Sequence, residues 1–143
     1  MFICNHCPYV IHYHGEIVKL SIDYNQKINM VAISSNDIIE YPQDSPERMK
    51  ELWNSLNLSF PYLFDETQQI AKKYKAECTP EFYLFNHQNK LEYRGRMDET
   101  SPGSDKLPSG KDLRMAIDNL LSNQPICKEQ LPSMGCNIKW KAN

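Results

Sequence analysis

The chain has 143 residues, the size of one ordinary globular domain, and it can bury a sizeable core without disulfide bonds. Its 16 basic and 18 acidic residues are interspersed and give a formal net charge of −2. This excludes the basic patch that nucleic acids or anionic membranes require, and no apolar run approaches the about 18 residues of a membrane span. We therefore expect neither a nucleic-acid partner nor a membrane association.

The chain contains five cysteines, which are Cys4, Cys7, Cys78, Cys127 and Cys136. An odd number leaves at least one thiol unpaired within a monomer and fits a disulfide framework poorly. The N-terminus also lacks the charged start and long apolar stretch of a signal peptide. Both features indicate a reducing compartment, so we expect a cytoplasmic protein with one working pair of thiols.

A long amphipathic helix is predicted directly after Cys7. Apolar side chains recur there at helical spacing, at Val10, Tyr13, Ile17, Leu20 and Tyr24. This places Cys4 at the N-terminus of the helix and leaves only residues 1–3 for the strand that would normally lead into it. Residues 28–34 (INMVAIS) are apolar on both alternating faces, which indicates a central strand covered by helices on both sides.

The middle of the chain predicts a second helix, a short strand and a third helix. Ser45 and Pro46 are typical of an N-cap and a first helical residue, and apolar residues at helical spacing follow them. Residues 60–65 (FPYLFD) predict a short strand. The apolar residues within 70–74 then indicate a short helix.

The last part of the chain predicts a hairpin, a loop and a helix. The runs 81–85 (EFYLF) and 91–96 (LEYRGR) are rich in β-formers, and polar residues join them. Residues 97–110 contain Pro, Gly and Ser and indicate a loop, and a final helix is predicted to begin near Ser109. The last twenty residues show no helical or strand periodicity.

This alternation of helices and strands predicts an α/β sandwich. No internal repeat or low-complexity segment divides the chain. We therefore expect one domain over residues 1–122 and a C-terminal tail, 123–143, that packs on the domain or extends from it.

Cys4 and Cys7 form a Cys-x-x-Cys pair whose position favours redox chemistry. Two thiols on the first turn of a helix are close enough to bridge, and the helix N-terminus stabilises a thiolate there. We therefore expect Cys4 to be the nucleophile and Cys7 to resolve the mixed disulfide that Cys4 forms with a substrate. A protonated His6 would lower the pKa of the thiol further below its free value of about 8.5.

The same pair is also half of a zinc site, for which His12 or His14 would supply a further ligand. The second half is missing, because neither Cys127 with Cys136 nor the two histidines repeat a tight ligand spacing. Cys127 and Cys136 either pair with each other in the tail or have no role. We expect no metal and no other cofactor.

Cys78, Thr79 and Pro80 precede the first strand of the predicted hairpin. A Cys-x-x-Cys at a helix start together with a proline at this place resembles the thioredoxin superfamily. The resemblance implies a three-layer sandwich with a mixed central sheet, a cis Thr79–Pro80 bond, and a turn at these two residues that holds a substrate chain beside the nucleophile. With Pro80 cis, Cys78 would lie near the Cys4 pocket as a third thiol, although a plain buried cysteine is the simpler interpretation.

Longer motifs resemble the redoxin branch of this superfamily, the alkyl hydroperoxide reductase and thiol-specific antioxidant group. They are CNHCPYV, FPYLFDETQ, CTPEFYLF, YRGRMD and GCNIKWK, and they run along nearly the whole chain. Members of this branch begin some tens of residues earlier, so the resemblance implies a fold that is truncated at its N-terminal strand or strands. Peroxiredoxins carry threonine or serine three residues before the peroxidatic cysteine, where this chain has Met1, which disfavours peroxidase chemistry.

We therefore predict a cytoplasmic thiol–disulfide oxidoreductase that acts in redox homeostasis through the Cys4–Cys7 couple. Its partners would be a protein or small-molecule disulfide and an external thiol reductant. The alternatives are a thiol-dependent peroxidase and a non-catalytic protein, either a redox-responsive binding protein or a metal carrier.

Overall fold

The computed structural model covers residues 1–143, and two strand ladders form its central sheet. β1 (Ala32–Ser34) pairs in parallel with β2 (Tyr62–Phe64). β4 (Phe82–Phe85) pairs in antiparallel with β5 (Leu91–Gly95). The predicted strands are therefore present, and the sheet is mixed, as expected.

Residues 1–3 join these two ladders. Phe2 bridges Ile33 of β1 in parallel and Glu81, next to β4, in antiparallel. The main chains of Phe2 and Glu81 exchange N–H···O bonds of 2.9 and 3.0 Å. The few residues that the sequence leaves for a leading strand thus lie in the middle of the sheet, and they fix the main chain immediately before Cys4.

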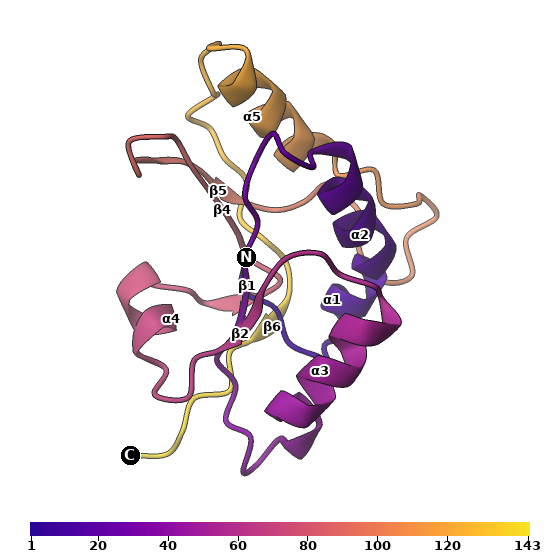
Figure 1. Cartoon of the computed structure of the whole chain (residues 1–143), viewed down its shortest axis with the longest axis vertical. Helices are drawn as coiled ribbons and strands as arrows, with labels where there is room; N and C mark the ends of the chain where they lie inside the picture. Colours follow the sequence, from indigo (N-terminus) through magenta and orange to yellow (C-terminus); the bar gives the residue numbers. More distant parts are fainter.

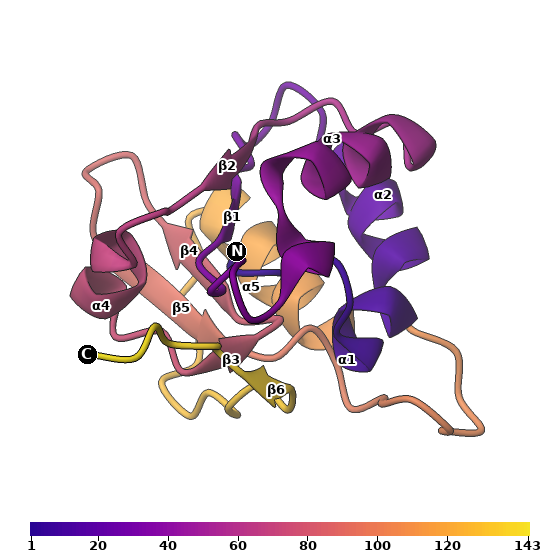
Figure 2. The same ribbon diagram turned by 90° about the horizontal axis from the view of Figure 1, so that it is seen from below.

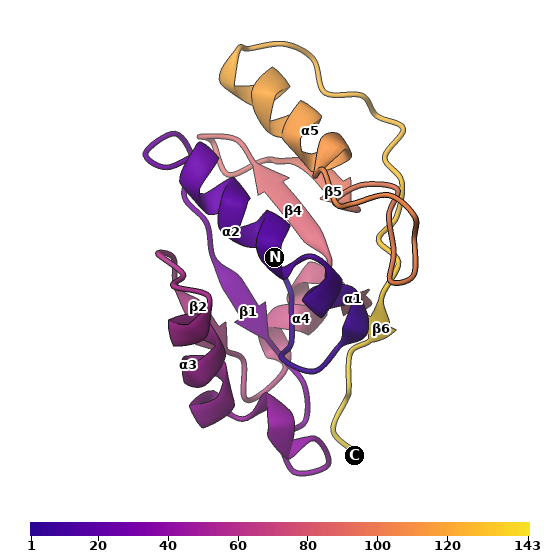
Figure 3. The same ribbon diagram turned by 90° about the vertical axis from the view of Figure 1, so that its right-hand side faces the viewer.

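Helices cover both sides of the sheet. One side carries α1 (Pro8–His12), α2 (His14–Asp23), α3 (Pro46–Ser55) and α5 (Lys111–Leu121), and the other side carries α4 (Gln69–Tyr74) (Figure 1). Figure 3 shows the first group in front of the strands and α4 behind them. None of these helices is both long and apolar enough to span a bilayer.

The buried side chains form two clusters that correspond to these layers. The larger cluster contains 18 buried residues and includes side chains of α1, α2 and α5. The smaller cluster consists of Phe2, Ala71, Ala76 and Ile138. Because side chains alternate along a strand, Phe2 faces the α4 side while Ile3 faces the larger cluster.

The predicted first helix is divided and begins later than expected. α1 begins at Pro8 with Cys7 as its N-cap, so Cys4 lies in the loop before the helix and not on its first turn. Proline is well suited to the first helical position because it has no N–H that would need a partner. α2 starts after Tyr13, whose hydroxyl donates to Asp98 Oδ1 over 2.8 Å and so ties this break to a distant loop.

The start of α3 confirms the prediction from its capping residues. Pro46 is the first helical residue, and Ser45 Oγ accepts a hydrogen bond from the N–H of Arg48 over 3.4 Å. A short 3-10 helix, η1 (Pro42–Asp44), directly precedes this cap and carries the buried Asp44.

The tail after α5 folds back onto the domain. β6 (Cys136–Asn137) pairs in antiparallel with β3 (Cys78–Thr79), and Figure 2 shows the two strands side by side. Ile138 is buried in the smaller cluster, and the N–H of Lys139 donates to Asn36 Oδ1 over 2.9 Å. The sequence shows no period in this segment, and this short strand was not predicted.

Candidate thiol redox site

The two cysteines of the Cys-x-x-Cys pair are both buried and both unoxidised. Cys4 is 1% exposed and Cys7 is 0% exposed, and neither forms a disulfide. Cys4 follows the central segment of the sheet directly, and Cys7 caps α1. The sheet and the helix therefore hold the two thiols from opposite ends of the same short loop.

Both thiols face Thr79. Cys4 Sγ lies 3.5 Å from Thr79 Oγ1, and Cys7 Sγ lies 3.3 Å from the Thr79 carbonyl oxygen. The Thr79–Pro80 peptide bond is cis, as the resemblance implied. The structure thus brings together four of the predicted site residues, although they come from segments more than 70 positions apart in the chain.

The interaction between the two thiols is the largest influence on the pKa of each. It lowers the pKa of Cys7 and raises that of Cys4, and burial raises both. The Cys136 thiol and the N–H groups of Val10 and Cys136 lower the pKa of Cys7 further. Together these effects favour the thiolate at Cys7 over a thiolate at Cys4, and the N-terminus of α1, which begins at Pro8, contributes through the N–H of Val10.

His6 lies beside the pair and points its ring at a carboxylate. Its Nδ1 is 2.6 Å from Asp44 Oδ2, and its ring stacks on Tyr41 with 5.6 Å between ring centroids. Asp44 is 0% exposed, and its charge adds to the rise in the pKa of Cys4, after the effects of Cys7 and burial. A positive charge on His6 would therefore be offset by Asp44, a residue that sequence reasoning missed because only the fold brings it to the loop.

The donor atoms of Cys4, His6 and Asp44 all lie within 4.8 Å of one another. Thiolate, imidazole and carboxylate donors suit Zn²⁺, so this group is where a metal carrier would bind its ion. Asp44 already accepts the N–H of Asn5 over 2.8 Å in addition to facing His6. These hydrogen bonds explain the position of the carboxylate without a metal.

Cys78 does not contact the pair. Its sulfur lies 3.8 Å from the carbonyl oxygens of Pro80 and Ser133, and burial raises its pKa to about 12. Side chains alternate along β3, so that Thr79 faces the pair while Cys78 points to the other side. Cys78, which the sequence offered as a third thiol or more simply as a buried cysteine, therefore points away from the pair.

A different third thiol does contact the pair. Cys136 Sγ lies 2.8 Å from Cys7 Sγ, and Cys136 is opposite Thr79 in the β3–β6 ladder. Cys127 is exposed elsewhere, so the two tail cysteines do not pair with each other. The only signal in the sequence was the motif GCNIKWK, whose place in the fold could not be derived from spacing.

The chain matches the model of the Redoxin family over residues 1–110. It belongs to the Redoxin family. An uncharacterized conserved protein from Geobacillus kaustophilus is 49% identical, with a TM-score of 0.97 over 100% of this chain and 76% of that one. A hypothetical protein from Sinorhizobium meliloti 1021 is 40% identical, with a TM-score of 0.96 over 99% of this chain and 78% of that one.

A thioredoxin-like protein solved in solution in its oxidized form shares the fold of this redoxin. It is 18% identical, with a TM-score of 0.67 over 86% of this chain and 76% of that one. Among proteins of curated function, none matches the chain significantly. The predicted α/β thioredoxin-like fold and the redoxin resemblance are thereby confirmed.

The turn that faces the thiols of this redoxin is held by an ion pair between the buried Glu81 and the partly exposed Arg94. Glu81 directly follows Pro80, and its Oε1 accepts from Nε and Nη2 of Arg94 on β5, over 3.1 and 2.9 Å. Its Oε2 accepts the N–H of Glu77 over 3.0 Å. Both Arg94 nitrogens donate to one oxygen of Glu81 while the other oxygen accepts from the main chain, so the carboxylate is held from two directions and fixes the main chain directly after Thr79 and Pro80.

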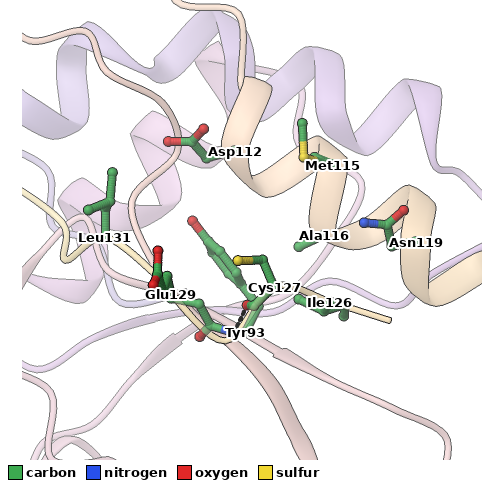
Figure 4. Close-up of a pocket in the computed structure, with 10 residues that line it drawn as sticks. Tyr93, Asp112, Met115, Ala116, Asn119, Ile126, Cys127, Glu129 and Leu131 are labelled. Carbon is green, nitrogen blue, oxygen red and sulfur yellow. Dashed lines mark hydrogen bonds between the residues drawn. The ribbon is translucent and has the colours of Figure 1, made fainter. Parts of the chain in front are cut away.

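One surface pocket of this redoxin lies away from the thiol pair. It is situated between β5, α5 and the tail, and Tyr93, Met115, Ile126 and Cys127 are among its lining residues (Figure 4). None of Cys4, Cys7 and Thr79 lines it. The site that carries the thiols is therefore a buried contact between segments and not this pocket.

Proposed function

We propose that this redoxin is a cytoplasmic thiol–disulfide oxidoreductase that cycles Cys4 and Cys7 between dithiol and disulfide. The observation that supports this most directly is the pair of buried, unoxidised thiols held against Thr79, one of them with a lowered pKa. A thiolate beside a second thiol is what disulfide exchange requires. The Redoxin family and the thioredoxin-like fold are consistent with thiol redox chemistry in general.

We keep Cys4 as the attacking thiol and Cys7 as its base and resolving partner. As Cys4 attacks a substrate disulfide, its proton passes to the Cys7 thiolate, a mixed disulfide forms at Cys4, and the first substrate thiolate leaves. That thiolate then takes the proton from Cys7. The Cys7 thiolate attacks the Cys4 sulfur, which forms the Cys4–Cys7 disulfide and releases the second substrate thiolate to be protonated by water.

The ladder between β3 and β6 bears on which disulfide is the substrate. Thr79 and Pro80 were expected to hold a substrate chain, but Thr79 is already paired with Cys136 of the tail. An extended protein substrate would have to displace β6, whereas a small disulfide needs no strand edge. We therefore favour a small-molecule disulfide as substrate, with an external thiol as the reductant.

The experiment adds oxidised glutathione to the reduced protein, blocks free thiols with N-ethylmaleimide, and locates the products by peptide mass spectrometry. The wild type should form an intramolecular disulfide that includes Cys7. The Cys7→Ser variant should stop at a mixed disulfide between Cys4 and glutathione, and Cys4→Ser should lower the rate of glutathione turnover to the background. Cys127→Ser is the matched control, because this thiol is exposed and lies outside the site.

Four results would contradict the proposal. A wild type that forms no intramolecular disulfide would exclude the oxidoreductase. Modification of Cys7 in Cys4→Ser, with Cys4 inert in Cys7→Ser, would exchange the roles of the two thiols. Rapid consumption of hydrogen peroxide with sulfenic acid at Cys4 would indicate a peroxidase instead, and bound zinc in stoichiometric amount would indicate a carrier.

A further inference from the structure

We infer that Cys136 is a third redox residue, which accepts the disulfide from the Cys4–Cys7 pair and forms a second disulfide with Cys7. The inference rests on the proposed dithiol function. It starts from the contact between the sulfurs of Cys7 and Cys136, which lie 2.8 Å apart. Cys7 thereby has a possible bonding partner on each side, one from its own loop and one from the tail.

The position of Cys136 is built into the fold and is not a chance contact of a loose tail. Cys136 lies opposite Thr79 in the β3–β6 ladder, and the N–H of Ile138 donates to the Glu77 carbonyl over 3.3 Å. Ile138 itself is 1% exposed. Main-chain pairing and a buried side chain thus fix the cysteine two residues before that anchor.

Gly135 shows how closely the tail approaches the site. A Cβ at this position would lie far closer to the carbonyl oxygen of Thr79 than real Cβ atoms come to any neighbour. Only glycine therefore allows the main chain to pass over Thr79 and to present the Cys136 side chain to Cys7. Gly135, the residue before the cysteine, is therefore the one amino acid that this close approach permits.

The exchange balances without any further oxidant. After a substrate disulfide has oxidised the pair, Cys136 loses its proton and its sulfur attacks Cys7 of the Cys4–Cys7 disulfide. The Cys7–Cys136 bond forms, the Cys4–Cys7 bond breaks, and Cys4 leaves as a thiolate that takes up a proton. The number of disulfides does not change, and Cys4 is again a free thiol.

Because the thiols differ in exposure, the transfer would move the disulfide to a position that an external reductant can reach. Cys4 and Cys7 are buried, whereas Cys136 is partly exposed. A disulfide that includes Cys136 is therefore more open to an external thiol than the Cys4–Cys7 disulfide. Two equivalents of such a thiol would restore the three free thiols of the protein and leave as one disulfide.

The test uses the same glutathione experiment with time-resolved quenching in acid. Trypsin leaves Cys4 and Cys7 together in peptide 1–19 and Cys136 in peptide 129–139, so the second disulfide appears as a crosslink between these peptides. We expect an internal disulfide in peptide 1–19 first, and then the crosslink, with N-ethylmaleimide on Cys4. Cys136→Ser should lose the crosslink and keep the internal disulfide, and Cys127→Ser should behave as the wild type.

The outcomes separate the two proposals. If the wild type forms only the Cys4–Cys7 disulfide up to equilibrium, or crosslinks Cys136 through Cys4, the role of Cys136 is wrong while the oxidoreductase stands. If the wild type forms no intramolecular disulfide at all, both fall. A crosslink with Cys7 that appears only after the internal disulfide supports both.

Discussion

The thiol pair lies beside a buried carboxylate as well as beside a helix N-terminus, and the two features act on different sulfurs. The N-terminus of α1 faces Cys7, whose pKa is lowered mainly through Cys4. Asp44 acts on Cys4, whose pKa is raised by the interaction with Cys7, by burial and by this negative charge. The two thiols therefore differ in protonation although they are three residues apart.

Replacing Asp44 with asparagine should make Cys4 more reactive. In a Cys7→Ser background, Asp44→Asn removes the negative charge near Cys4, so the pKa of Cys4 falls and its thiolate fraction at neutral pH rises. We expect alkylation of Cys4 by iodoacetamide to become several-fold faster at neutral pH. The rate is followed by mass spectrometry of peptide 1–19 over a range of pH.

Asp44→Asn should also destabilise the fold, so the free energy of unfolding is measured together with the alkylation rate. Asp44 accepts hydrogen bonds from Asn5 and Asn36, and an amide cannot replace both, so we expect a loss of about 1–3 kcal/mol in the free energy of unfolding. Asp118→Asn is the matched control, because Asp118 accepts a hydrogen bond from Tyr24 and faces no thiol. An unchanged rate at Cys4 in a folded Asp44→Asn protein would show that the carboxylate does not act on this thiol.

Cys4, Cys7, Thr79 and Pro80 could be proposed from the sequence because each belongs to a short motif that is recognisable without knowledge of the fold. It did not identify Asp44 or Cys136, since each is brought to the pair by a contact across more than 35 residues. The helix start was predicted too early by one turn. The proline that sets it belongs to the motif itself, but spacing alone does not show whether a cysteine lies on the first turn or before it.

At the scale of elements, the predictions were best where the signal is local. The start of α3 follows from Ser45 and Pro46, and the hairpin of β4 and β5 follows from two runs of β-formers. The tail strand could not be predicted in this way. β6 has two residues and is defined by its partner β3, from which it is separated by more than 50 positions, so no periodic pattern accompanies it.

The close approach of β6 gives an element-scale prediction. Gly135→Ala places a Cβ against the Thr79 carbonyl, so the tail has to move away from β3 and Cys136 has to move away from Cys7. We expect the Cys7–Cys136 crosslink to fall several-fold although no thiol has been removed. Overpacking of this kind costs about 1–3 kcal/mol, which urea unfolding of the reduced protein measures.

Gly15→Ala is the matched control for that substitution. Gly15 lies in α2, and an added Cβ there would meet nothing within 4 Å. Alanine should therefore leave the crosslink unchanged and stabilise the helix by up to about 1 kcal/mol. A Gly135→Ala protein that crosslinks as fast as Gly15→Ala would show that the tail tolerates the shift and that glycine is not what positions Cys136.

At the scale of the whole molecule, the site is the place where distant parts of the chain meet. Residues 1–3 join the two ladders, the turn at Thr79 lies beside them, and β6 closes the other side. A change in the protonation or oxidation of Cys7 therefore acts on contacts that hold the sheet and tail together. Stability and redox state should be linked through this one sulfur.

The last prediction is a pH-dependent difference in stability between the reduced and oxidised forms. In the reduced folded protein the pKa of Cys7 lies below its ordinary value, whereas in the unfolded chain it is about 8.5. Between these two values the unfolded chain binds one more proton, so the reduced form gains stability as the pH rises. Either disulfide, with Cys4 or with Cys136, removes the thiolate and with it this gain.

We measure the free energy of unfolding of both forms by heat and by urea between about pH 5 and pH 8. The value for the reduced form should rise relative to that for the oxidised form, by at most about 1.4 kcal/mol per pH unit. Other titrating groups are common to both forms and largely cancel in the difference. The gain should reverse above about pH 8.5, because the unfolded chain then ionises Cys4, whose folded pKa is raised. Reduced Cys7→Ser should lack the rise, and a flat difference in the wild type would show that Cys7 is not a thiolate in the folded protein.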